Sequence, residues 1–469
     1  MHDVADGLPH WRCVGRKGKR LRGRILGFLT GRLISTAGCT RATLSFVTAD
    51  KDTDAGSTNS TSVGVAPAAL APPTTTSASS YLVEAKFSDS GWFELESSPA
   101  PSGSPTLAGS TAPDPRRSAT LDENLYSMLS SERLVVLTGL GTSLGLKTSA
   151  GAAAPTMRDL FDAVKVLAGF TDVAPLDPVA SNPKDPNVEA LLSACQFQAA
   201  LSPTHPASKF LTLAQDRILE LCNFVDETTD LSTHNAFLRK VARRQAKLER
   251  TQIFTTNYDL AFEKSAQATN ANVIDGFGLA RQGFFDGNSF DLDVVRRRRG
   301  EPPILEPNTF HLLKLHGSID WDESDGEVSR TSTPKNPVLI YPSQHKYQLA
   351  FRPPYLESMS RLQMALREPD ITLVSIGFGF NDDHITGPIE AAIRSNIGLR
   401  LIVVRPDAKT STNWHPTMSM LDKLIDSGDR RITLLNMTFS DFVKLIPETS
   451  PSDERELHSE RVIKAGRGI

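Results

Sequence analysis

The chain has 469 residues, a net charge of −3 and an apolar content of 39%. The nearly neutral charge argues against a protein that coats nucleic acid. The four cysteines lack the close paired spacing of a disulfide framework or a four-cysteine zinc site. No apolar run reaches the roughly 18 residues of a membrane-spanning helix, so no membrane association is expected. A reducing, cytoplasmic setting fits these features best.

The first 80 residues differ in composition from the remainder of the chain. Their second part consists mainly of Ser, Thr, Ala, Gly and Pro, which bury too little apolar area to offset the entropy of ordering. We therefore predict that residues 1–80 are disordered or of low complexity. Two runs that follow, Tyr81–Phe87 and Trp92–Glu96, are separated by a short turn and predict a β-hairpin. A Pro/Ser-rich linker completes residues 81–118.

Residues 119–445 alternate between apolar strands and helices, which predicts a doubly wound, Rossmann-like parallel α/β sheet. Arg133–Leu137 is a short apolar run that ends in glycines, as a buried parallel strand does. The further strands are predicted at Gln252–Thr256, Phe310–Leu315, Val338–Tyr341, Ile371–Ile376, Leu399–Val404 and Ile432–Leu435.

Helices are predicted between these strands. Pro155 is expected in the first turn of one helix, and another is expected over Tyr355–Glu368, where it ends at a proline. Residues 183–249 contain three or four helical segments without a strand, which predicts an inserted helical module. The Gly-rich, charged residues 271–307 are expected to form an insertion loop, and residues 446–469 a flexible tail.

The first candidate site is the glycine turn that ends the first strand of the sheet. Gly139 and Gly141 permit a tight turn there. Thr142 and Ser143 follow, where backbone N–H and hydroxyl donors can meet a pyrophosphate. The third glycine of the usual dinucleotide motif comes one place late, at Gly145, and no acidic residue follows at the usual distance, which disfavours a hydride-transfer dehydrogenase. A plain strand–loop turn is the alternative.

The second candidate site is Thr256-Asn257-Tyr258-Asp259, which follows the next strand. The carboxyl ends of parallel strands open into the ligand crevice, so Asn257 is placed to orient a ribose or a water molecule. Asp259 is expected either to line the same crevice or to cap the helix that follows.

The third candidate site is Leu315-His316-Gly317-Ser318. A histidine that ends an apolar strand and precedes a glycine is poorly placed to fill a core. Histidine can act as a general base because its unperturbed pKa is about 6.5. A structural role for His316 is the alternative.

The fourth candidate site is the segment that follows Ile371–Ile376. Gly377 and Gly379 would allow a ligand to approach the backbone closely. Asn381 or Asp382 is expected either to bind ribose hydroxyls or to cap the next helix. His384 is expected to be a helix residue rather than a second catalytic base.

Together these four strand ends resemble the sirtuin (silent-information-regulator-like) family, and most of all its divergent bacterial branch, the sirtuin-like NAD hydrolases of anti-phage defence. The resemblance spans about residues 121–442. It implies that NAD is the substrate, that the nicotinamide–ribose bond is broken, and that Asn257 and His316 are the catalytic pair. It further implies that the NAD-binding residues are Gly139, Gly141, Thr142, Ser143, Asp259, Gly317, Ser318, Gly377, Phe378, Asn381 and Asp382.

The chain departs from the family pattern in two ways. Leu140 stands where family members usually have alanine, which is expected to reshape the phosphate turn. The two-plus-two cysteine zinc ribbon of protein-deacylating sirtuins is also missing from the sequence. We therefore expect no zinc, and we favour simple NAD hydrolysis over an NAD-dependent deacylase or ADP-ribosyltransferase. A non-enzymatic sensor of NAD or ADP-ribose is the remaining alternative.

The resemblance also implies that activity is gated, by assembly into a homo-oligomer and by a partner such as a hexameric DNA-translocating ATPase. Nucleic acid would then be contacted only indirectly. The basic run Arg296–Arg299 and the basic N-terminal stretch are expected to be solvated loop charge.

Overall fold

The structure, a computed structural model, describes residues 83–95, 115–177, 187–245, 247–278, 283–297, 299–300, 302–339, 353–409, 415–447 and 461–462. All of them belong to one compact unit, residues 71–469. The predicted disordered region, most of the predicted Pro/Ser-rich linker and nearly all of the predicted tail lie outside the described residues, as do Ile340 and Tyr341 of a predicted strand.

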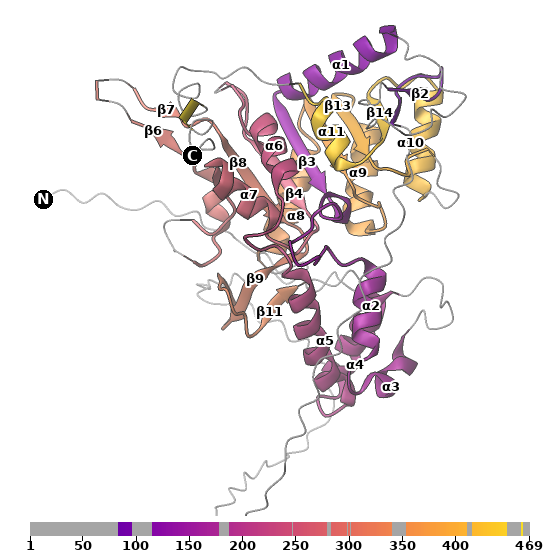
Figure 1. The fold of residues 1–469 in the computed structure, drawn as a ribbon, viewed down its shortest axis with the longest axis vertical. Coiled ribbons are helices and arrows are strands. Elements are labelled where there is room, and N and C mark those ends of the chain that lie inside the picture. The colour runs from indigo at the N-terminus through magenta and orange to yellow at the C-terminus, as the bar shows by residue number, and fades with distance from the viewer. Residues whose placement is uncertain are drawn as a thin grey trace, which may run out of the picture. The chain divides into compact units, whose positions relative to one another are not determined.

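A nine-stranded sheet in the order β2-β1-β14-β13-β12-β3-β4-β8-β5 forms the centre of this unit (Figure 1). Every pairing from β14 to β5 is parallel, whereas the hairpin β1–β2 adds to β14 in antiparallel fashion. The prediction of a doubly wound, Rossmann-like sheet is confirmed. The strands are β1 (Glu84–Lys86), β2 (Phe93–Glu94), β3 (Arg133–Thr138), β4 (Thr251–Thr255), β5 (Asn272–Ile274), β8 (Thr309–Lys314), β12 (Ile371–Ile376), β13 (Leu399–Val404) and β14 (Ile432–Asn436).

Helices cover both faces of the sheet, because successive side chains of a strand point to opposite faces. Leu134 and Val136 of β3 belong to one core cluster, and Val135 and Leu137 belong to the other. The helices of the first cluster are α1 (Pro115–Ser130), α6 (Ser232–Val241), α7 (Ala261–Thr269) and α11 (Phe439–Leu445). Those of the second are α8 (Tyr355–Ala365), α9 (Asp383–Ser395) and α10 (Pro416–Asp426).

A separate helical module has its own core, to which Ile319 and Leu339 of a small antiparallel sheet also contribute. The module differs from the predicted 183–249, because helices before residue 183 join it and α6 packs on the main sheet instead. Its helices are α2 (Met157–Lys165), α3 (Phe170–Val173), α4 (Val188–Leu201) and α5 (Pro206–Cys222). The small sheet has the order β10-β9-β11, and its strands are β9 (Gly317–Ser324), β10 (Glu327–Arg330) and β11 (Pro337–Leu339).

Three local predictions are wrong. The strand predicted from Val338 onward belongs, as β11, to the small sheet rather than the parallel one. Residues 271–307 contain the edge strand β5, and also the short pair β6 (Val295–Arg296) and β7 (Ile304–Leu305), rather than only a loop. Pro155 precedes its helix, because Thr156 is the N-cap and forms a capping box with Asp159.

None of the helices in the described part of the chain combines the length and apolar character that crossing a bilayer requires.

The order of the strands reverses at β3. The strands β4 and β8, which follow β3 in the sequence, lie on one side of it, and β12, which comes later, lies on the other. Ligands bind at such a switch point in doubly wound sheets. The loops after β3 and β12 touch there through glycines. A Cβ on Gly139 would lie 2.7 Å from the carbonyl oxygen of Gly377, and one on Gly141 would lie 2.5 Å from the Gly377 Cα. Glycine at these positions is therefore required by contact between two loops.

Gly141→Ala is expected to lower the free energy of unfolding by roughly 1–3 kcal/mol, the usual cost of overpacking. The added methyl would collide with backbone, which cannot rotate away as a side chain can. Urea unfolding measures the change. Gly145→Ala is the matched control, since a Cβ there meets nothing within 4 Å, and it should change stability by less than about 0.5 kcal/mol. Equal effects of the two substitutions would show that the loops do not touch in this way.

Candidate functional site

The carboxyl ends of β3, β4, β8, β12 and β13 surround a cavity of about 840 Å³. Most of the residues singled out from the sequence line this cavity, although they come from four separate segments. These are Gly139, Gly141, Thr142, Asn257, Asp259, His316, Gly377, Phe378, Asn381 and Asp382. The predicted binding residues Ser143, Gly317 and Ser318 are not part of the lining; all three are buried.

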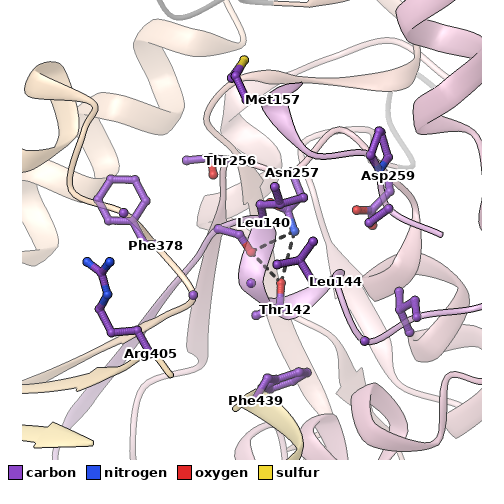
Figure 2. A pocket seen from close by; sticks show the side chains of 18 of the residues that line it. Leu140, Thr142, Leu144, Met157, Thr256, Asn257, Asp259, Phe378, Arg405 and Phe439 are labelled. Atoms are coloured by element: carbon purple, nitrogen blue, oxygen red, sulfur yellow. Dashed lines mark hydrogen bonds between the residues drawn. The ribbon is translucent and has the colours of Figure 1, made fainter. Parts of the chain in front are cut away.

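Asn257 joins the end of β4 to the glycine turn after β3 (Figure 2). Its Nδ2 donates to the carbonyl oxygen of Gly139 at 3.1 Å, the Thr142 hydroxyl at 3.1 Å and the Ser143 hydroxyl at 2.9 Å. Its Oδ1 accepts no hydrogen bond from the described residues. The amide is therefore held in one orientation, with its oxygen left as the acceptor for a ligand.

Asp259 lines the cavity and also bonds to the first residue of α7, although the N-cap of that helix is Leu260. Its Oδ2 accepts from the Ser143 hydroxyl at 2.7 Å, and its Oδ1 accepts from the backbone N–H of Ala261 at 3.0 Å. Ser143 thus connects Asn257 to Asp259. Thr142 donates its own hydroxyl hydrogen to the Gly139 carbonyl at 2.9 Å. Both hydroxyls hold the loop together, and their contact with a pyrophosphate stays a prediction.

Backbone donors remain available around the glycine turn. The N–H groups of Gly139 and Gly141 are already bonded to the end of β12 and the loop that follows it. The N–H groups of Leu140, Phe378 and Gly379 donate to nothing within the described ranges, and all three residues line the cavity. Unbonded backbone N–H groups at strand–helix turns are the usual ligands of phosphate.

Leu140, one of the two departures from the family pattern, has a packing role. Its partly buried side chain packs against a small apolar cluster that includes Leu146, Phe224 and Ala261. The Leu140 side chain therefore holds the turn against this cluster. The close contact with Gly377 is made by Gly139 and Gly141 on either side of Leu140.

His316 follows β8 and is only 3% exposed. His384 lies in the first turn of α9, as a helix residue, and its Nε2 is 3.2 Å from the Nε2 of His316. The two ring planes are inclined by 28°, with their centroids 5.3 Å apart. The carboxylate of Asp382 lies within 4.8 Å of a ring nitrogen of each histidine. No local sequence pattern could indicate this contact, because 68 positions separate the two histidines.

Lys314, which was not predicted from the sequence to have a role here, supports the site from outside the cavity lining. It ends β8, is 3% exposed, and donates from Nζ to the Asp259 carbonyl oxygen at 2.6 Å and to the Ser318 hydroxyl at 2.8 Å. It also forms an ion pair of 3.0 Å with Glu263 of α7. Burial raises the pKa of Glu263, and the charge of Lys314 opposes that rise. A lysine inside the apolar run 312–315 was the signal available in the sequence.

His234 of α6 is a buried histidine that also lines the cavity. It is 1% exposed and lies between the rings of Phe262 and Phe439, at centroid distances of 5.2 Å and 5.1 Å. Neither ring nitrogen has a hydrogen-bond partner in the described part of the chain. Burial lowers its pKa to about 4, although the nearby charge of Asp259 acts in the opposite direction.

Acid is therefore expected to destabilise the fold through His234. Its pKa in the folded state lies below the value of about 6.5 in the unfolded state. At a pH between these two pKa values, protons therefore bind preferentially to the unfolded chain. The stabilisation is complete above pH 6.5 and is lost as the pH falls toward 4. The free energy of unfolding in urea should fall between pH 7 and pH 4.5 in both proteins. The fall should be smaller in His234→Leu than in the wild type by roughly 2 kcal/mol. Identical losses in the two proteins would contradict this.

Part of the chain is similar to known proteins. Residues 251–415, about a third of the chain, match the family model described as a SIR2-like domain. No curated protein matches the sequence. Two point mutants of a Sir2 homologue in complex with ADP-ribose and a Sir2 homologue–NAD complex are similar solved structures, each at 14% identity. They cover 69% of this chain and 94%, 94% and 92% of their own chains, with TM-scores of 0.34, 0.33 and 0.29.

The segment matched by the family model contains β4, β8 and β12, the strands that present Asn257, His316 and Gly377 at their carboxyl ends. Residues 251–415 of this chain are similar to SIR2-like domains.

Proposed function

We propose that this protein is an NAD glycohydrolase, which breaks the bond between nicotinamide and ribose and releases nicotinamide and ADP-ribose. The observation that carries the proposal is that Asn257 and His316 line the same cavity as the glycine turn after β3. An amide, an imidazole and a phosphate-binding turn are the groups that hydrolysis of a dinucleotide at its ribose requires.

The cavity suits a ligand of this kind. Its volume of about 840 Å³ lies within the range of roughly 300–1,000 Å³ typical of small-molecule sites. We assign the pyrophosphate to the backbone N–H groups of Leu140, Phe378 and Gly379. The rings of Phe378 and Phe439, which also line the cavity (Figure 2), offer apolar surface to the flat rings of a dinucleotide.

Cleavage of the nicotinamide–ribose bond needs no general acid, because the leaving group does not have to be protonated. When the bond from ribose C1′ to the ring nitrogen breaks, the electron pair leaves with nicotinamide, which departs as a neutral molecule. The ribose passes through an oxocarbenium-like state. The protein must therefore position the sugar, exclude bulk water and admit one nucleophile.

Asn257 and His316 divide these tasks. We assign the Oδ1 of Asn257 to accept a hydrogen bond from the attacking water or from a ribose hydroxyl, since its Nδ2 is bonded to the glycine turn. We assign His316 to take the proton of that water as its oxygen bonds to C1′. Ser143 and Asp259 then act as positioning residues, because they hold the amide and the turn together.

Product analysis tests this function. The purified full chain, incubated with NAD alone, should release nicotinamide and ADP-ribose in equal amounts, as measured by chromatography. Addition of an acyl-lysine peptide should leave the rate unchanged. Release that requires the peptide, or transfer of ADP-ribose to protein, would identify a deacylase or a transferase instead. NAD that binds and is recovered intact would identify a sensor.

The resemblance to defence-associated NAD hydrolases extends the proposal to the cell. We propose that the protein acts in the cytoplasm as a homo-oligomer and depletes NAD during phage infection, gated by a partner such as a hexameric DNA-translocating ATPase. Bacteria that express the chain should lose NAD after infection and keep it when uninfected. An NAD level unchanged by infection would contradict the defence role.

A further inference from the structure

We propose that His316, His384 and Asp382 form a zinc-binding site at the edge of the cavity, and that zinc bound there inhibits the enzyme. The binding half stands on the geometry of these three side chains alone. The inhibitory half rests on the function proposed above. The sequence led us to expect no zinc because of its cysteine spacing, and this site contains no cysteine.

The three side chains lie close enough together to share one ion. One ligand atom from each lies within 4.8 Å of the others. The two Nε2 atoms are 3.2 Å apart, and two zinc–nitrogen bonds of about 2.05 Å at a tetrahedral angle would place them about 3.3 Å apart. Only a small movement of either ring would admit an ion between them.

The types of ligand select the class of ion. Two imidazoles and one carboxylate suit zinc and similar first-row transition metals, whereas magnesium and calcium prefer sites made of oxygen. Two histidines with one carboxylate, and a fourth position left open, is a ligand set used by zinc in proteins. His316 and Asp382 both line the cavity, so the open position would be accessible to water or to a ligand.

The backbone supports this set of ligands. His316 follows the last residue of β8, in the buried interior, and Asp382 is the N-cap of α9, two positions before His384. No side chain must be recruited from a long loop, since a strand end and a helix start supply all three.

Occupation of this site would remove the base from the reaction. Zinc binds the lone pair of an imidazole nitrogen, and His316 needs such a lone pair to accept a proton. Cys222, which also lines the cavity, is a poor alternative ligand for zinc. Its burial, assisted by the charge of Asp259, raises the pKa of its thiol to about 12, and the thiolate is the form that binds metal.

Titration of the chelator-treated full chain with zinc chloride, followed by calorimetry, tests the site. We expect the affinity to fall by roughly 10-fold or more in His384→Ala and in Asp382→Asn. Asp383→Asn is the matched control, because this neighbouring carboxylate is exposed and lies outside the cluster; it should bind zinc as the wild type does. Cobalt chloride should give a visible absorption band in wild type that is lost in His384→Ala. Wild-type binding by both cluster variants would overturn the proposal.

Nicotinamide release by the wild type, measured with and without zinc chloride, tests the inhibition. We expect zinc to slow release and a chelator to restore it, and Asp383→Asn to respond in the same way. An unchanged or faster rate with zinc bound would overturn the inhibitory half. Absence of NAD cleavage under all conditions would remove the inhibitory half together with the proposed function, and the titration alone would then decide the site.

Discussion

His316→Ala is expected to lower the rate of nicotinamide release by about 10²-fold or more, the usual contribution of a general base. In the proposed mechanism, the imidazole acts on the water only as the reaction proceeds and does not help to bind NAD. Its removal should therefore lower kcat and leave KM nearly unchanged. Initial rates over a range of NAD concentrations separate the two constants. The protein should stay folded, because the side chain borders a cavity rather than filling the core.

The matched control is His205→Ala, which removes an imidazole from the N-cap of α5, outside the cavity lining. It should turn over NAD at nearly the wild-type rate. Circular dichroism of both variants confirms that each is folded. Turnover by His316→Ala that equals that of the control would remove His316 from the mechanism.

Lys314→Met is expected to lower the free energy of unfolding by roughly 3–5 kcal/mol, the usual cost of leaving one partner of a buried ion pair alone. The lysine is 3% exposed, and its loss would strand Glu263 without the charge that lies 3.0 Å from it now. The carbonyl oxygen of Asp259 and the hydroxyl of Ser318 would also lose their donor. Urea unfolding at pH 7 measures the effect.

Two further variants isolate the buried pair. Lys444→Met removes an exposed lysine that pairs with Asp441 at 3.1 Å, and should cost less than about 1 kcal/mol. The double variant Lys314→Met with Glu263→Gln should recover much of the loss, because neither charge is then left alone. A cost at Lys314 no larger than at Lys444, or a double variant as unstable as the single one, would contradict the expected strength of the pair.

The parallel strands could be predicted from the sequence because they are buried on both faces. Such strands are continuous apolar runs, and Ile371–Ile376 and Leu399–Val404 are found at the predicted residues. The edge strand β5 escaped prediction because it has three residues within a charged, Gly-rich segment. The prediction for β11 named the wrong sheet. Its composition does not indicate its partner, because the pairing of β11 with β9 depends on the tertiary structure.

The place of the site could also be predicted, since polar residues at the ends of parallel strands must share one edge of the sheet. Asn257 and His316 were found in this way, and both line the cavity. Contacts between distant segments could not be found. The glycines of the turn proved to be required by Gly377, and the contact of His384 with His316 spans 68 positions. No local pattern records either contact.

In the proposed mechanism, one cavity holds NAD with its nicotinamide ribose between Asn257 and His316. An experimental structure of His316→Ala with NAD, which removes the base and slows cleavage, tests this most directly. We predict that the ribose lies within hydrogen-bond distance of the Asn257 Oδ1 and that the pyrophosphate lies against the backbone of Leu140 and Phe378. NAD bound elsewhere, or in this cavity with its nicotinamide end away from Asn257, would rule out this mechanism.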